Sequence, residues 1–272
     1  MQNFSISPRE IIASFWRNHS LIYALSKREV AGRYRGSYFG ILWSFFNPLL
    51  MLAIYTFVFS IIFKARWNEQ SDSKTEFALV LFAGLIMFNF FSECITKAPN
   101  LILSNVNYVK KVVFPLDILP WVSLYSALFH AVISLLVWLI AYSIFYGLPH
   151  ITVLYMPVVI APFALMIMGL SWLLAGAGVY LRDIGQIIGI FVSALMFLSP
   201  IFYSISYIPE KFQLMMLMNP LTIPVEEIRN CLFWGTEFNY GYLLAYWCIS
   251  LLICCAGFAW FQSVRKGFSD VL

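Results

Sequence analysis

The stretch that decides the fold class runs from Ile118 to Phe145 and reads ILPWVSLYSALFHAVISLLVWLIAYSIF. It contains no Asp, Glu, Lys or Arg, and it exceeds the roughly 20 apolar residues that a helix needs to cross a bilayer. The extra length permits a tilt or a kink but indicates no particular angle. This stretch predicts a membrane-spanning helix.

Five further apolar stretches predict that the protein crosses the membrane six times. They are Ile41–Phe63, Phe77–Ile95, Val153–Tyr180, Ile187–Tyr203 and Tyr242–Phe261. The composition agrees, because 61% of the 272 residues are hydrophobic and only 11% are charged, against about 25% charged in a typical soluble domain. A single soluble core stops growing near this chain length, so lipid is expected to cover much of the apolar surface.

We predict one all-α membrane domain over residues 1–272. Its parts are a cytoplasmic or interfacial segment, five spans, an outer re-entrant region and a sixth span, at residues 1–40, 41–203, 204–240 and 242–261. Before the first span, Ile11, Ile12, Phe15 and Trp16 are spaced to share one face of a short amphipathic helix on the membrane surface. A solvated helix packed on a partner fits the same pattern.

The outer region, residues 204–240, is apolar but is interrupted by three prolines and several charged side chains. No charge-free run in it is long enough to cross the bilayer. Two short re-entrant or interfacial helices, near 210–218 and 224–234, fit better than a seventh span. Because such backbone survives at membrane depth only beside protein or water, the region is predicted to lie over the outer mouth of a path.

Basic residues are distributed unevenly between the two sides that alternating spans create. Of the 17 Lys and Arg residues, five fall on one side, namely Lys64, Arg66, Lys74, Lys211 and Arg229. The remaining twelve fall on the side that holds both termini. The positive-inside rule therefore predicts that both termini are cytoplasmic.

The sequence contains no motif typical of an enzyme or an ATPase. The GxxxxGK[ST] phosphate loop, HExxH and GxSxG are absent, and the three histidines are far apart. The five cysteines include no CxxC pair, so neither a disulfide framework nor a zinc site is indicated. The net charge of +4 is small for a nucleic-acid binder. We expect no catalytic or metal site on this chain and no nucleic-acid partner.

Aromatic residues suggest a path for a polymer. Tyr55, Phe59 and Phe63 recur every fourth residue on the first predicted span, and Phe202 and Tyr203 lie where the fifth meets the outer region. Sugar rings have apolar C–H faces that can lie on aromatic faces, so a glycan could slide along such a surface. Contact with lipid or with other helices is the alternative reading.

Two further features of the spans are candidates for function. Glu93 is the clearest ionisable residue inside a span, which makes it a functional candidate unless its carboxylate reaches the cytoplasmic interface. Gly185, Gly189 and Ser193 repeat at four-residue spacing and form a ridge that lets another backbone approach closely. This small-residue ridge could serve helix packing within the chain or a dimer or channel face.

Several motifs, taken in order, resemble the permease subunits of type-2 ABC exporters of polysaccharides and polyol phosphates. They are RYRGSYFGILW at Arg33–Trp43, NP at Asn47–Pro48, SNVNYVKKVVFP at Ser104–Pro115, YLRDI at Tyr180–Ile184, SPIFY at Ser199–Tyr203, NPL at Asn219–Leu221 and EIR at Glu227–Arg229. Each is weak alone, but their ordered combination over residues 33–229 is specific. The details are most similar to O-antigen exporters.

The resemblance implies a homodimer bound to two copies of a separate ABC-type ATPase, which would bind the ATP and magnesium. It implies that the substrate is a lipid-linked glycan, with O-antigen the best match, moved across a bacterial inner membrane. It also implies ATPase contacts on the cytoplasmic loops, at Ser104, Asn105, Tyr108, Lys110, Lys111, Arg182 and Asp183. Capsular polysaccharide, teichoic acid and drug exporters are alternatives, and a membrane-embedded glycosyl- or acyltransferase is the alternative outside transport.

Overall fold

The computed structural model describes residues 5–62, 67, 74–110 and 114–272, and within these ranges all regular secondary structure is helical. Five of the described helical segments are long and apolar enough to cross a membrane, namely Gly40–Phe59, Thr75–Asn100, Leu116–Tyr146, Ile151–Tyr180 and Tyr240–Val271. The predicted all-α membrane class is therefore confirmed.

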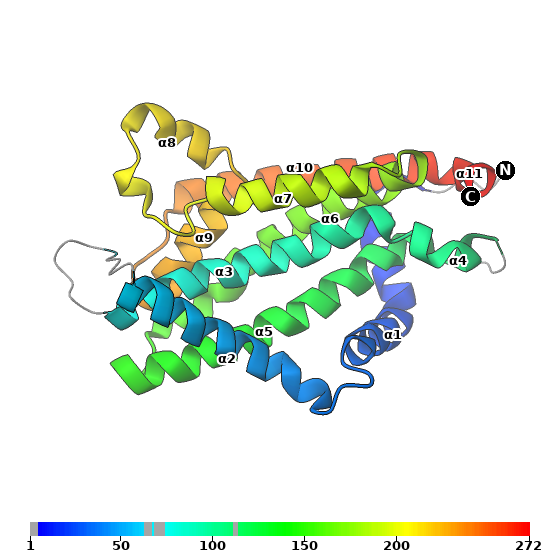
Figure 1. The fold of residues 1–272 in the computed structure, drawn as a ribbon. Helices are drawn as coiled ribbons and strands as arrows, with labels where there is room; N and C mark the ends of the chain where they lie inside the picture. The colour runs from blue at the N-terminus through cyan, green and yellow to red at the C-terminus, as the bar shows by residue number, and fades with distance from the viewer. Residues whose placement is uncertain (1–4, 63–66, 68–73, 111–113) are drawn as a thin grey trace.

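These segments contain α2 (Trp43–Tyr55), α3 (Lys74–Lys97), α5 (Leu119–Tyr146), α6 (Met156–Tyr180) and α10 (Tyr240–Val264), which form an elongated bundle (Figure 1). Helix α2 runs obliquely across α5, against which it packs (Figure 1). After α2 the chain continues as a π-helix at Thr56–Ile62. Such widened turns are frequent at functional sites.

The fifth predicted span, Ile187–Tyr203, is shorter in the structure than expected. The apolar helix α7 covers Ile184–Leu198, and its 15 residues reach roughly 22 Å, less than the roughly 30 Å of a bilayer core. The helix ends because Pro200 disfavours a helical conformation at the residue before it, and Ser199 is indeed extended, with ψ 152°. The predicted end at Tyr203 is wrong.

The two ends of the bundle carry different short elements. Both termini lie at one end, together with α1 (Pro8–Arg33), α4 (Val106–Lys110) and α11 (Phe268–Val271) (Figure 1). The opposite end carries α8 (Glu210–Leu217) and α9 (Thr222–Arg229), which is followed by a π-helical turn (Figure 1). These two helices lie where the sequence predicts short helices in the outer region.

Helix α1 is much longer than the short amphipathic helix predicted before the first span. The hydroxyl of Ser7 accepts from the amide of Arg9 and caps its start. Ile11 is buried, whereas Ile12 and Trp16 are 63% and 67% exposed. Part of the predicted apolar face therefore packs against the protein, and part of it is exposed on the protein surface. A helix with one packed side and one exposed apolar side remains compatible with a membrane surface.

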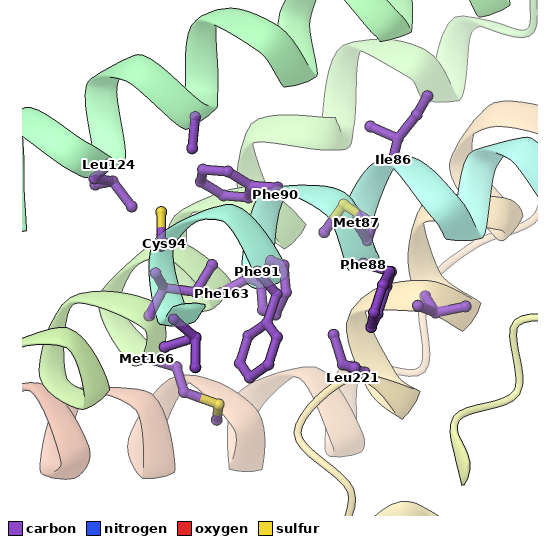
Figure 2. Packing of buried hydrophobic residues seen from close by; sticks show 14 of the residues in the cluster. Ile86, Met87, Phe88, Phe90, Phe91, Cys94, Leu124, Phe163, Met166 and Leu221 are labelled. Carbon is purple, nitrogen blue, oxygen red and sulfur yellow. The ribbon is translucent and has the colours of Figure 1, made fainter. Parts of the chain in front are cut away.

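Helix α3 forms the centre of the core. Figure 2 shows Phe90 and Phe91 of α3 beside Phe163 of α6, and the rings of Phe91 and Phe163 stack with centroids 6.1 Å apart. Leu124 of α5 and Leu221, just before α9, pack around the same helix (Figure 2). Because α3 contacts α2, α5, α6, α7 and α9, it fixes their relative positions.

Helices α6 and α10 meet at two glycines that the sequence analysis did not single out. A Cβ atom added to Gly257 would collide with the backbone oxygen of Gly169, and one added to Gly169 would collide with the backbone of Ile253. The absence of side chains lets the two backbones touch, as at other small-residue crossings in membrane proteins. Gly178 of α6 makes an equally close approach, to the backbone oxygen of Pro99.

Candidate functional site

A polar cavity of about 470 Å³ opens between the end of α1 and helices α2, α3 and α5. It is lined by Arg33, Tyr34, Ser44, Asn47, Pro48, Met51, Tyr55, Phe82, Asn89, Ser92, Glu93, Thr96, Lys97, His130 and Ser134. Between Phe77 and Ile95, Asn89 is the one exposed residue on α3. The cavity is therefore where the central helix meets the surroundings of the protein.

Glu93 joins an ionic network at one end of this polar cavity. Arg33 Nη1 and Lys97 Nζ donate to Glu93 Oε1 over 2.7 and 3.0 Å, and His130 Nδ1 lies 2.9 Å from Glu93 Oε2. Lys97 also donates to Glu29 over 2.8 Å. The Glu93 side chain is only 14% exposed, so its carboxylate is held by cations inside the bundle rather than left in solvent. The sequence analysis missed Arg33 and His130 as its partners.

An aromatic row begins at the same cavity. The ring of Tyr55 lies 6.4 Å from that of Phe59, and the ring of Phe59 lies 5.8 Å from that of Phe202. Phe202 in turn stacks on Phe197, with centroids 5.8 Å apart. The row made by Tyr55, Phe59, Phe202 and Phe197 thus connects the polar cavity to the end of α7.

Three of the five residues predicted for a substrate path therefore lie together, at positions 55, 59 and 202. Tyr203 donates its hydroxyl to the carbonyl of Phe197 over 3.2 Å, but its ring makes no contact with the rings of the row among the described residues. Phe63 lies outside the described residues. The role of these aromatics in transport stays a prediction.

Arg229 holds the turn that carries Phe202. Its side chain is 1% exposed, and it donates to the carbonyls of Val80, Pro200 and Ile201 over 3.1, 2.6 and 2.7 Å. One guanidinium thus ties the end of α9 to α3 and to the turn after α7. The sequence analysis counted Arg229 only as a charge on the outer side.

The surroundings of Arg229 keep the guanidinium charged. Burial lowers the pKa of Arg229 to about 10 and raises the pKa of Glu226, while the 3.0 Å ion pair between them opposes both shifts. Arg229 is therefore protonated at neutral pH. Its guanidinium carbon also lies 4.4 Å from the ring centroid of Trp67, a cation–π contact.

The described parts of the two loops predicted to contact an ATPase lie at the end of the bundle that carries α4 and α11 (Figure 1). Ser104 and Asn105 donate to the carbonyls of Asn100 and Leu101 over 2.7 and 2.9 Å. Tyr108, on α4, stacks on Phe114 with centroids 4.3 Å apart. These bonds give the segment before α4 a defined shape.

The second predicted contact loop adjoins the first. Arg182 and Asp183 are exposed between α6 and α7, and a Cβ atom added to Gly185 would lie 3.4 Å from the side-chain nitrogen of Asn100. The structure thus brings together the two loops that the resemblance assigns to ATPase contact. Lys111 lies outside the described residues, as does the side chain of Lys110.

The sequence pattern of the ABC-2 type transporter family matches residues 20–233. This chain belongs to the ABC-2 type transporter family. Two proteins of Klebsiella pneumoniae named O-antigen export system permease protein RfbA are 26% and 23% identical to it, over 93% of this chain and 95% of each relative. A protein of the same name from Myxococcus xanthus is 25% identical, over 96% of this chain and 98% of the relative.

The match confirms the family that the motifs resemble. The chain is a multi-pass membrane protein and a transport subunit rather than an enzyme. Both predicted ATPase-contact loops and most of the outer region fall inside the matched residues 20–233. The membership also implies an ABC-type ATPase as partner.

The small-residue ridge of this ABC-2 transporter chain faces outward. A Cβ atom added to Gly189 would meet no described heavy atom within 4 Å, and Ser193 is exposed. Helix α7 is buried instead through Val192 and Leu195. A Cβ atom added to Gly185, in contrast, would lie 3.4 Å from the side chain of Asn100. Both predicted roles of the ridge, helix packing within the chain and a dimer or channel face, therefore stay predictions.

Asp117 joins four elements near the predicted ATPase-contact loops. Its carboxylate accepts from the hydroxyl of Ser14 on α1 and from Arg265 Nη1 over 2.9 Å at the end of α10. Its carbonyl accepts from Trp172 Nε1 of α6 over 3.0 Å. Arg265 also donates to the carbonyl of Phe114, which stacks on Tyr108. In the sequence, these contacts of Asp117 are signalled only by a single acidic residue in an otherwise apolar stretch.

Proposed function

We propose that this chain is the membrane subunit of an ATP-driven exporter that moves a lipid-linked polysaccharide, O-antigen being the best match, across the inner membrane of a Gram-negative bacterium. The observation that carries the proposal is similarity along 93% or more of the chain to three proteins named for O-antigen export. The aromatic row supports a substrate with sugar rings, since aromatic faces suit their apolar C–H faces.

The proposed assembly contains two copies of this chain and two copies of a separate ABC-type ATPase, which binds the ATP and magnesium. The outward ridge on α7 supports a second copy, because it leaves room for another backbone. The cytoplasmic side is proposed to be the end that carries both termini and the predicted ATPase-contact loops. That assignment follows the excess of basic residues there.

Motion of the ATPases has a short physical route into the spans. The predicted ATPase-contact loops adjoin each other through Asn100, and Phe114 links the segment near α4 to Arg265 and Asp117. The bonds of Asp117 then reach α1, α6 and α10. Closure of the ATPase pair would therefore shift several helices together rather than one loop alone.

The aromatic row gives a moving polymer a surface without deep traps. Each aromatic contact is worth about 1 kcal/mol, so a sugar can leave one ring for the next at ambient temperature. Arg229 holds the turn at the far end of the row in place through backbone carbonyls. A rigid turn keeps Phe202 opposite Phe59.

The experiment that tests this function is deletion of the gene in its own bacterium, followed by complementation. We expect surface polysaccharide to disappear, lipid-linked polysaccharide to accumulate on the cytoplasmic side, and the wild-type chain to restore export. Normal surface polysaccharide in the deletion strain would contradict the proposal. Loss of a phosphodiester polymer instead would transfer the assignment to teichoic-acid-type export.

A further inference from the structure

We propose that the polar cavity between α2, α3 and α5 is a carbohydrate-binding site, which holds one or two sugar residues of the substrate at the start of the aromatic row. This inference rests on the proposed function and adds the site at which the glycan is first held. The cavity volume of about 470 Å³ falls within the range of about 300–1,000 Å³ that is typical of sites for small ligands.

Two side-chain amides, those of Asn47 and Asn89, are positioned to bind a ligand in the cavity. Asn89 is exposed on a helix whose neighbouring residues are buried, and Asn47 is exposed on α2 across the cavity. A polar amide within a span costs free energy unless water, protein or a ligand hydrogen-bonds to it. Within the described part of the chain, neither side-chain amide has a hydrogen-bond partner. Both are therefore available to a ligand as donors and as acceptors.

The charges in the cavity favour a neutral ligand over an anionic one. The two cations of the network, Arg33 and Lys97, are already bonded to the carboxylates of Glu93 and Glu29. A phosphate could bond to the N–H groups of Arg33 that Glu93 leaves unused, but it would then lie beside the Glu93 carboxylate, which repels an anion. A sugar hydroxyl meets no such repulsion, because it can bond to the neutral amides. The arrangement therefore favours hydroxyl groups over phosphate.

Hydroxyl groups in the cavity wall can also bond to a sugar. Thr96 and Ser134 donate to carbonyls of their own helices over 2.6 and 2.9 Å, so their oxygens remain as acceptors toward the cavity. The hydroxyl of Tyr55 has no hydrogen-bond partner among the described residues. The wall thus offers both donors and acceptors, as the hydroxyls of a sugar require.

The cavity is continuous with the aromatic row. Tyr55 lines the cavity and is also the first ring of the row. A sugar bonded to Asn47 and Asn89 therefore has an aromatic face beside it and the next ring, Phe59, beyond. The amides would select a hydroxyl-rich group, and the rings would carry it onward.

The test uses the intact exporter with its ATPase, in cells from which the chromosomal copy of this chain is deleted. Asn89→Leu and Asn47→Leu keep side-chain volume similar and remove the hydrogen bonds. A neutral hydrogen bond contributes about 0.5–1.5 kcal/mol, so each single variant should export about two- to tenfold less surface glycan at equal membrane level. The double variant should lose about four- to a hundredfold, and Asn89→Gln, which keeps the amide, should recover part of the loss.

The matched control is Thr56→Val on the other side of α2, where the hydroxyl bonds to the carbonyl of Leu52 and lines an apolar cavity. It should export normally. A direct readout places the photo-crosslinker benzoylphenylalanine at position 89 or, as a control, at Ile140, and stains the purified chain for bound carbohydrate. We expect carbohydrate at position 89 only, and only in cells that synthesise the glycan.

The outcomes separate this inference from the proposed function. If the wild-type chain restores surface glycan but position 89 captures no carbohydrate, the cavity is a water-filled vestibule and the inference is overturned while the function stands. Normal export by the Asn47/Asn89 double variant would overturn it equally. If the wild-type chain restores no surface glycan, the proposed function fails and this inference fails with it.

Discussion

Helices α2 and α3 are both apolar enough to cross a membrane, yet they occupy opposite environments. In the most apolar 18-residue stretch of each span, 11% of the residues are buried in the span that contains α2 and 83% in the span that contains α3. Lipid and protein interior are both apolar, so the two environments select similar side chains. Hydropathy therefore locates a span but does not show whether protein or lipid surrounds it. The low burial of α2 also shows that one of its faces is not covered by the rest of the chain.

The largest expected effect comes from removing one ring from each helix. Phe91 of α3 is 1% exposed, whereas Phe57, on the π-helix that continues α2, is 55% exposed. Phe91→Ala should cost about 3–5 kcal/mol, because the cavity left in a tight core does not refill. Phe57→Ala should cost less than about 0.5 kcal/mol. Thermal unfolding in detergent measures both, and equal losses would refute the contrast between the two helices.

A smaller effect is expected where α2 is proposed to touch substrate. Tyr55→Leu and Phe59→Leu preserve apolar volume but remove flat rings, each worth about 1 kcal/mol. We expect each single variant to lower surface glycan a few-fold and the double variant to compound the loss. Phe57→Leu, at an exposed position of the π-helix after α2, is the control. Wild-type export by the double variant at matched membrane level would show that this row only packs the helix.

The smallest effect concerns a buried acid on α9, which packs against α3. Burial raises the pKa of Glu227, and weak bonds from the Asn239 amide and the Asn230 side chain only partly oppose this. The folded state therefore binds the proton more tightly than the unfolded state, so stability falls as pH rises from about 4.5 through the raised pKa. Glu227→Gln should thus unfold at a slightly higher temperature than wild type at pH 7, with the gap closing toward pH 4.5. A gap independent of pH would exclude this cause.

Local patterns in the sequence predicted much of the fold. Charge-free runs located the spans, and prolines with charges located α8 and α9, because both signals act over a few residues. The end of α7 was missed although its cause, Pro200, was visible in the sequence. Ordered short motifs were enough to predict the family.

The polar partners could not be predicted, because they depend on how helices cross. Glu93 was singled out, but Arg33 and His130 lie 60 and 37 residues from it. Asp117 and Arg265 are separated by 148 residues. The small-residue ridge on α7 was visible as a spacing pattern, yet the closest backbone contacts of glycines inside the chain are made by Gly169, Gly178 and Gly257. Spacing along one helix does not show which side meets another.

We propose that the free faces of α2 and α7 meet a second copy of the chain in the proposed homodimer. The π-helix after α2 and the turn after α7 meet where Phe59 contacts Phe202, and the ridge on α7 is open at Gly189 and Ser193. The other exposed apolar faces, such as that of α5 at Ile140, would then face lipid. A cross-linking experiment in native membranes can distinguish these surfaces.

The most direct measurement replaces the five native cysteines, introduces Ser193→Cys or Ile140→Cys, and treats membranes that contain the assembled exporter with a short thiol-to-thiol cross-linker. The account predicts a covalent dimer of this chain from Ser193→Cys and none from Ile140→Cys, with both variants still exporting. A dimer from position 140 together with none from position 193 would contradict it.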